Sequence, residues 1–294
     1  MLAPSYGISM MEQMQTMRDA WGIEMEMDIN GTGPMPKPGK FILKSIKEWP
    51  EIVKAPYQRD FDFKTAAERD MATQILDRKE QLVLASGLGG GYFMHLANFM
   101  GFEGAMLAMY DEPEAVHEML EYICDYDVWY ASKVLDNYDV DIVGFGDDNA
   151  TEINPFISYE MFKEFLFPRY KRLFDVANQR GIPISYHNCG RCEDFMDDMV
   201  SIGTRVWSAA TPANDLNAFK ARHNNKVIIE FLPRMFPEDS EGVTRQKVRD
   251  YIELYAPDGA FIYVSYPLSM NPDLAYLGDW IFDEAKTYGK GFYL

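Results

Sequence analysis

The residue types best suited to chemistry lie together in one short segment, His187-Asn188-Cys189-Gly190-Arg191-Cys192. In an extended chain, residues i and i+2 point to the same face, so the His187 imidazole and the Cys189 thiol can converge on one ion. Gly190 permits a tight turn, and Cys192 follows within reach of the same point. Imidazole and thiolate together suit zinc, which keeps an open position beside three protein ligands when it is catalytic. The alternative is a neutral hydrogen-bonded histidine beside two inert thiols.

A second candidate group is the acidic pair Asp147-Asp148. Adjacent residues of a strand point to opposite faces, so at most one of these carboxylates faces the interior while the chain stays extended. That carboxylate would act as a general acid or base, or as a metal ligand. The alternative is one buried carboxylate satisfied by backbone N–H groups and one that is solvated.

Six short apolar runs, bounded by polar residues, Gly or Pro, alternate with helical patterns from residue 82 onward. They are residues 82–85, 140–145, 182–186, 205–208, 227–231 and 261–265. Such runs are typical of strands buried on both faces of a parallel sheet, and their alternation with helices indicates βαβ units.

The expected fold class is therefore α/β, and six such strands favour a TIM (β/α)8 barrel over an open doubly wound sheet. The glycine-rich run 87–91 lacks the spacing of a dinucleotide-binding fingerprint, so we expect a βα loop at the barrel mouth there. A closed barrel needs eight strands, and the first two would have to lie within residues 1–22. We expect an incomplete N-terminal strand set.

The candidate groups follow the carboxyl ends of these runs, where parallel barrels form their active sites. Glu230 lies inside the run 227–231 and is a further candidate metal ligand. Arg234 follows the same run and is a candidate catalytic residue that would anchor a substrate carboxylate.

The composition narrows the possible partners and the compartment. The 294 residues carry a formal charge of −18, which argues against a nucleic-acid binder because such a protein needs a basic face. Three cysteines are too few for a disulfide framework, which indicates a reducing compartment. There is no apolar run of about 18 residues and no signal-peptide pattern at the start. We expect a cytoplasmic protein with no membrane contact.

The N-terminal part of the chain has a different character. Two extended segments, 23–29 and 40–44, flank a stretch rich in Gly and Pro over residues 30–39. We expect a β-like excursion closed by a loop.

In order and spacing, several of these segments resemble the uroporphyrinogen decarboxylase superfamily, in its branch of corrinoid- and coenzyme M-linked methyltransferases. The segments are 21–27, 31–34, Gly146-Asp147-Asp148, 156–158, 165–168, 214–216, 219–220 and 226–229. His187-Asn188-Cys189-Gly190 is similar to the His-x-Cys-Gly of the methyltransferase branch. The resemblance implies one barrel domain over residues 1–294, with an N-terminal excursion and loop over 1–60 and a barrel core over 80–294.

The resemblance also implies an activity. It implies a zinc-dependent methyltransferase that moves a methyl group between a small methylated substrate and a corrinoid protein or thiol. The chain shows no corrinoid-binding module, so the corrinoid would be carried by a separate partner protein. Asp147 or Asp148 would be a ligand, a proton donor or an orienting group, and a homodimer is a further expectation.

The sequence departs from the family pattern at two places. Methyltransferases of this kind have a third zinc ligand, a Cys, at the end of the last strand, where this chain reads Val264-Ser265-Tyr266-Pro267. The third ligand is then Cys192, an acidic residue (Asp147, Asp148 or Glu230), or absent.

The N-terminal Arg-rich loop and the Asp of true decarboxylases are also missing, and Glu12 and Gln13 stand near the place of that Asp. A decarboxylase of porphyrinogens, which needs a cationic pocket, is the alternative enzyme. A non-catalytic barrel that binds a ligand is the third hypothesis.

Overall fold

The structure is a computed structural model that describes residues 17–27, 34–73, 77–79, 81–233, 237–264 and 272–292. Its centre is a parallel sheet of six strands in the sequential order β3-β4-β5-β6-β7-β8. The strands are β3 (Leu84–Ala85), β4 (Ile142–Gly146), β5 (Ile184–His187), β6 (Thr204–Ala210), β7 (Ile228–Phe231) and β8 (Phe261–Tyr263). Each strand overlaps one of the six predicted runs, so the predicted α/β class is confirmed.

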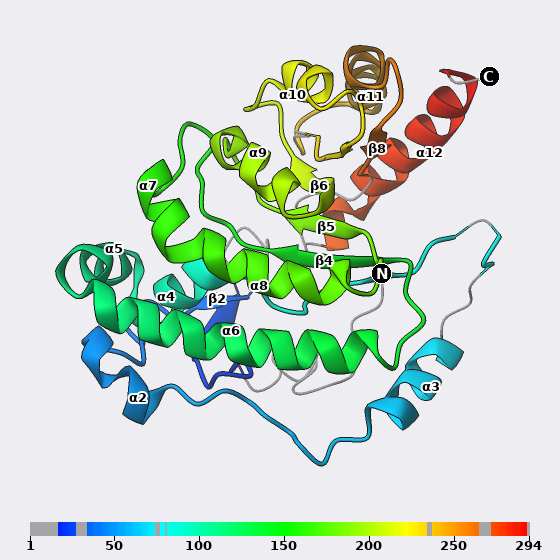
Figure 1. The fold of residues 1–294 in the computed structure, drawn as a ribbon. Helices are drawn as coiled ribbons and strands as arrows, with labels where there is room; N and C mark the ends of the chain where they lie inside the picture. The colour runs from blue at the N-terminus through cyan, green and yellow to red at the C-terminus, as the bar shows by residue number, and fades with distance from the viewer. Residues whose placement is uncertain are drawn as a thin grey trace.

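The sheet is a curled half-barrel (Figure 1). The six parallel strands of the described residues neighbour one another in chain order, which is the strand arrangement of part of a TIM barrel. Within the ranges described, no strand pairs β3 with β8, so the sheet has an edge at each of them. The additional strands expected within residues 1–22 fall mainly on residues outside the described ranges.

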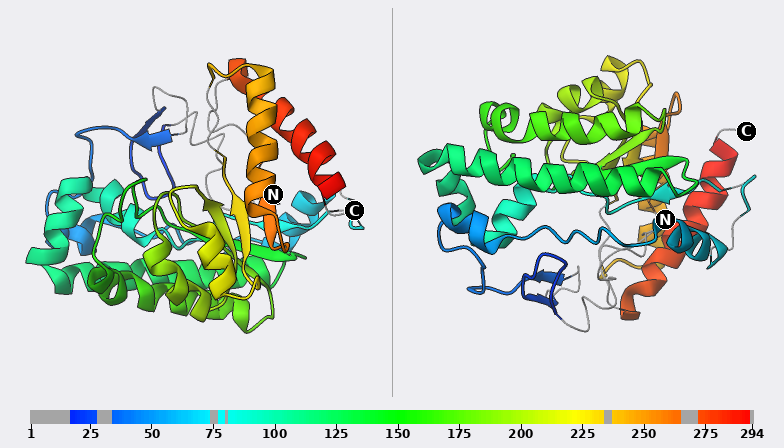
Figure 2. Two further views of the ribbon diagram at one scale, coloured as in Figure 1. Left: turned by 90° about the horizontal axis from the view of Figure 1, so that it is seen from above. Right: turned by 60° about the horizontal axis from the view of Figure 1, so that its bottom comes forward.

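Helices connect the strands, because a parallel connection must cross back over the sheet. They are α4 (Tyr92–Met100), α5 (Phe102–Asp111), α6 (Pro113–Leu135), α7 (Tyr159–Met161), α8 (Phe167–Asn178), α9 (Glu193–Ser201), α10 (Leu216–Arg222) and α11 (Glu241–Tyr255). A last helix, α12 (Ala275–Phe292), follows β8. The π-helical segment Phe162–Leu166 joins α7 to α8. The two long helices α6 and α8 lie side by side (Figure 1), and α11 packs on α12 (Figure 2). None of the described helices is long and apolar enough to span a membrane.

The N-terminal excursion is a small hairpin followed by short helices. Strand β1 (Met25–Met27) pairs antiparallel with β2 (Pro34–Pro36), apart from the main sheet (Figure 2). The second arm therefore lies in the proline-containing stretch and not at residues 40–44 as predicted. Proline is tolerated there because a two-stranded ribbon leaves some N–H positions facing outward. The segment continues through a 3-10 turn (Ile46–Glu48), α2 (Trp49–Ile52) and α3 (Phe63–Thr73).

The glycine-rich loop between β3 and α4 is held by two buried carboxylates. The Gly90 N–H donates to the Asp127 carboxylate of α6 at 2.9 Å. The Phe93 and Met94 N–H groups, in the first turn of α4, donate to Asp147 at 2.7 and 3.0 Å. The loop predicted at the barrel mouth is thus anchored where it enters α4 by acids from distant parts of the chain.

Stability should depend on pH through Asp127, because burial raises the pKa of this group from 3.8 to about 7. Between these two pH values the folded state holds a proton that the unfolded state releases. The contribution of protonated Asp127 to the free energy of unfolding is therefore fully present below about pH 4 and is lost as the pH rises to about 7. Asp127→Asn keeps an acceptor for Gly90 and carries no charge. The free energy of unfolding of the variant minus that of the wild type should therefore increase by about 1.4 kcal/mol per pH unit across this window.

Urea unfolding of both proteins at about pH 4.5 and about pH 7.5 measures this difference, which should be on the order of 3 kcal/mol larger at the higher pH. A difference that does not change with pH would show that Asp127 is already ionised in the folded state.

Candidate metal centre

Asp147 and Asp148 leave the end of β4 in opposite directions. Asp147 is buried and accepts four hydrogen bonds, from the N–H groups of Phe93, Met94 and Asp148 and from the Tyr170 hydroxyl at 2.6 Å. Burial raises the pKa of Asp147 to about 7. The structure thus places Asp147 as the anchor of the first turn of α4, with its carboxylate already occupied.

Asp148, His187 and Cys189 lie together in one group, called the metal-type group below. The His187 Nε2 atom is 3.6 Å from Asp148 Oδ1 and 3.4 Å from Cys189 Sγ. The Cys189 N–H also donates to Asp148 Oδ1, at 3.1 Å, which fixes the carboxylate against the loop that follows β5. Within the described ranges, this is the group whose ligand atoms, one from each residue, all lie within 4.8 Å of one another. The same-face spacing expected of His187 and Cys189 is present.

The group suits a cation. Burial, together with the neighbouring Asp148, raises the pKa of the Cys189 thiol to about 12. A thiol beside a carboxylate gains a stable thiolate only when a positive charge lies between them, and a coordinating metal deprotonates it outright. The side chains of His187 and Asp148 are 39% and 48% exposed, so an ion can reach them from solvent.

Two of the three separations between the ligand atoms fit zinc. Zinc bonds of about 2.3 Å to sulfur and about 2.0 Å to nitrogen or oxygen, at a tetrahedral angle, place neighbouring ligand atoms about 3.3 to 3.6 Å apart. The two contacts of His187 Nε2, at 3.4 and 3.6 Å, agree with this. One carboxylate, one imidazole and one thiolate form a three-ligand set of the kind that leaves a fourth position open.

Cys192 is not brought to this group. Its side chain is fully buried, and its thiol lies 3.5 Å from the Asn188 carbonyl. The Asn214 side chain accepts the N–H groups of Cys192 and Glu193, where α9 begins. The chain has left the extended conformation after Gly190, so the thiol turns into the core and the predicted ligand role of Cys192 has no support in this geometry.

Glu230 lies on β7, two strands away from His187 of the metal-type group. Burial raises the pKa of its carboxyl group above the ordinary value, and the neighbouring Ser208 side chain opposes this shift. The Ser208 hydroxyl lies 3.3 Å from His187 Nδ1. Glu230 therefore reaches the group through Ser208, a residue that the sequence pattern did not single out. Arg234, the predicted anchor for a carboxylate, lies outside the described residues.

The group opens onto a cavity of about 420 Å³ at the carboxyl ends of the strands. Its walls are the glycine-rich loop, small residues of β4 and β5, and the side chains of Asp148, His187, Ser208 and Glu230. In the described part of the chain, no Lys or Arg lines this cavity. The cavity is therefore acidic and suits a neutral or cationic ligand better than a polyanion.

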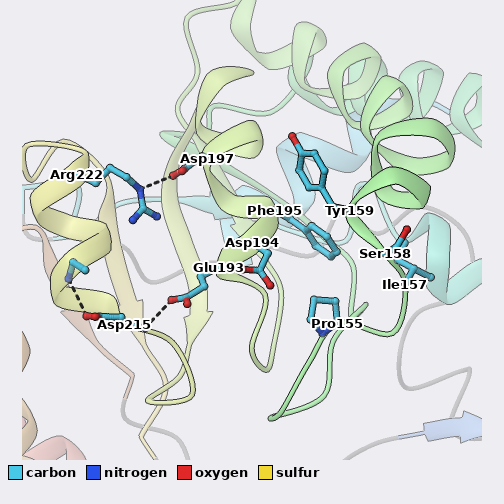
Figure 3. A pocket seen from close by; sticks show the side chains of 11 residues that line it. Pro155, Ile157, Ser158, Tyr159, Glu193, Asp194, Phe195, Asp197, Asp215 and Arg222 are labelled. Atoms are coloured by element: carbon cyan, nitrogen blue, oxygen red, sulfur yellow. Dashed lines mark hydrogen bonds and ion pairs between the residues drawn. The ribbon is translucent and has the colours of Figure 1, made fainter.

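A second pocket, of about 750 Å³, lies between the start of α7 and helices α9 and α10 (Figure 3). It is larger, but none of the metal-type group lines it. Its charged side chains are already engaged: Arg222 pairs with Asp197 at 3.0 Å, and Glu193 accepts the Asp215 N–H at 2.7 Å (Figure 3). We therefore place the chemistry at the smaller cavity.

The two acids at the end of β4 can be separated by matched variants. Asp148→Asn should weaken zinc binding by roughly tenfold or more, because a neutral amide replaces a charged ligand oxygen. Asp147→Asn retains a side-chain oxygen for α4 and should leave the zinc affinity unchanged. Competition with a chelator measures both. Equal losses in the two variants would contradict this assignment of roles.

The structural comparison agrees with this architecture. A methyltransferase from Methanosarcina mazei has a similar structure, with a TM-score of 0.62 and 13% sequence identity over 92% of this chain and 77% of that protein. At this identity the likeness establishes the fold. The search of the curated proteins found no match.

The sequence comparison establishes the family. The family model described as uroporphyrinogen decarboxylase (URO-D) matches residues 8–264, a range that contains the six strands and every residue of the metal-type group. The chain belongs to the uroporphyrinogen decarboxylase family.

Proposed function

We propose that this protein is a zinc-dependent methyltransferase that moves a methyl group between a small methylated substrate and a corrinoid protein or thiol. The observation that carries the proposal is the convergence of Asp148, His187 and Cys189 at the mouth of the cavity. The similar fold of a protein named as a methyltransferase supports it.

Each residue of the site would have a distinct role. Asp148, His187 and Cys189 would hold the zinc, which when bound acts as a Lewis acid on the heteroatom that carries or receives the methyl group. The glycine-rich loop leaves room for a substrate beside the His187 ring, because its residues place no bulky side chains there. Asp127 and Asp147 keep this loop in place through the hydrogen bonds described above.

The charge of the cavity supports methyl transfer over decarboxylation of a porphyrinogen. A porphyrinogen carries several carboxylates, and its binding requires cationic side chains. The described lining instead offers Asp148 and Glu230 and neither Lys nor Arg. An uncharged or cationic methylated compound is the substrate class that such a cavity would accept.

The decisive experiment combines metal analysis with a transfer assay. The purified protein should contain close to one zinc per chain. With zinc bound, it should transfer a methyl group from one of a panel of methylated thiols, amines and aromatic ethers to free cob(I)alamin, with loss of the Co(I) absorption. Cob(I)alamin gains the methyl group, and the heteroatom keeps the electron pair of the broken bond and takes up a proton.

Other outcomes would point to the two alternative functions. Release of carbon dioxide from a porphyrinogen, without bound zinc, would establish the decarboxylase. Bound zinc without turnover of any compound in the panel, with cobalamin or with a thiol as the acceptor, would favour the binding protein.

A further inference from the structure

Three polar residues lie side by side on three neighbouring strands next to the metal-type group. His187 of β5 is the register partner of Ser208 of β6. Ile229 and Trp207, which directly precede Glu230 and Ser208, are register partners of β7 and β6. His187, Ser208 and Glu230 all line the cavity, so the three side chains face the same side of the sheet.

The three side chains form a continuous polar chain. Glu230 lies beside Ser208 in the cavity wall, and the Ser208 side chain lowers the pKa that burial raises. The Ser208 Oγ atom is 3.3 Å from Nδ1 of His187, and the other ring nitrogen, Nε2, is the atom that faces Asp148 and Cys189. One end of the chain is thus an acid and the other end is the candidate metal ligand.

The Ser208–His187 hydrogen bond has a preferred direction, which follows from the chemistry of the groups. A carboxylate only accepts, so the Ser208 hydroxyl beside Glu230 turns its single hydrogen toward that carboxylate. The Ser208 oxygen then accepts, and the only donor His187 can offer it is Nδ1–H. A neutral imidazole with its proton on Nδ1 has a bare Nε2, whose lone pair is available to a metal.

We propose that Ser208 and Glu230 are positioning residues, which hold His187 in the tautomer and ring orientation that present Nε2 to the metal. The inference rests on the proposed zinc site and deepens it. It also gives Glu230 a role other than the direct ligation considered from the sequence. Neither residue touches the ion; they act through the imidazole.

The first test reads the tautomer in the metal-free protein. Long-range ¹H–¹⁵N correlation spectra at about pH 8 distinguish Nδ1–H from Nε2–H for each of the four histidines. His187→Ala assigns the signals. The wild type should show His187 as the Nδ1–H tautomer, and Ser208→Ala should show a mixture of both tautomers. An Nε2–H tautomer in the wild type, or the same spectrum in Ser208→Ala, would overturn the proposal.

The second test measures zinc affinity by chelator competition. Ser208→Ala and Glu230→Ala should each bind zinc roughly 10- to 100-fold more weakly, the usual effect of removing an outer partner of a metal-bound histidine. Glu230→Gln keeps an acceptor oxygen for Ser208 and should restore most of the affinity. Ser185→Ala is the matched control, since Ser185 lines the same cavity on β5 but is no part of this polar chain.

The two tests separate this inference from the proposed function. If the wild type bound no zinc, the metal function would fail, while the tautomer measurement would still decide whether Ser208 controls His187. If zinc bound tightly and Ser208→Ala matched Ser185→Ala in affinity, the zinc site would stand and the positioning role would be wrong.

Discussion

Replacing His187 or Cys189 with alanine is expected to weaken zinc binding by more than about a hundredfold, which exceeds the usual loss for an outer partner. Each variant removes one of three donor atoms from a group whose contacts are 3.4 and 3.6 Å. The two remaining ligands fill only half of the four positions of a tetrahedral zinc site. Zinc content after dialysis against a chelator, together with the dissociation constant from competition, measures the loss.

Cys192→Ala provides the control for this experiment. Its thiol faces the Asn188 carbonyl in the core, so the variant should keep its zinc, although it creates a small cavity and loses some stability. A loss of zinc affinity as large as that of Cys189→Ala would mean that Cys192 turns toward the ion when it binds. The assignment of Asp148 as the third ligand would then be wrong.

The second large effect is expected from Gly190→Ala, which should lower the free energy of unfolding by about 3 kcal/mol or more. Gly190 has φ +81°, a conformation that costs an L-residue roughly 1–2 kcal/mol. A Cβ atom at this position would also lie 2.5 Å from the Thr151 carbonyl oxygen and 2.9 Å from that of Ala150. Both obstacles are backbone, so neither can move aside as a side chain would.

The strain should also distort the candidate metal centre, because Gly190 directly follows Cys189. The Gly190 carbonyl accepts from Asn214 at 2.8 Å, and the Arg191 N–H donates to Thr151 at 2.7 Å, so this turn is tied to two other segments. We expect Gly190→Ala to bind zinc more weakly than the wild type, measured in the same competition assay.

Gly181→Ala separates the two causes. Gly181 has φ +67° but no atom within 4 Å of its expected Cβ position, so its substitution should cost only the conformational strain of about 1–2 kcal/mol. Urea unfolding of both variants gives the comparison. Equal losses would show that the carbonyl contacts of Gly190 relax without cost, which would contradict the steric explanation.

The strands and the first two candidate ligands were accessible from the sequence because they depend on local geometry. Six brief apolar runs predicted six buried strands, and all six are present in one parallel sheet. The side-chain alternation of an extended chain likewise predicted that His187 and Cys189 share a face. Neither inference requires knowledge of what the rest of the chain does.

The choice between the two adjacent acids required the folded chain. The alternation rule allowed either Asp147 or Asp148 to face the interior site. Asp147 is occupied by the start of α4 and by Tyr170, groups that lie 54 and 23 positions away in the sequence. Contacts over such separations carry no local periodicity, so no spacing rule could reveal them.

Cys192 and Ser208 illustrate the same difference between what local sequence determines and what the tertiary structure decides. Cys192 is near the site in sequence, but the turn after Gly190 breaks the strand geometry and Asn214 draws the chain into α9. Ser208 is 21 positions from His187 and reaches it because strands β5 and β6 pair in one particular register. Backbone conformation follows from neighbouring residues, whereas the partners of a side chain follow from strand register and packing, and these form only when distant segments come together.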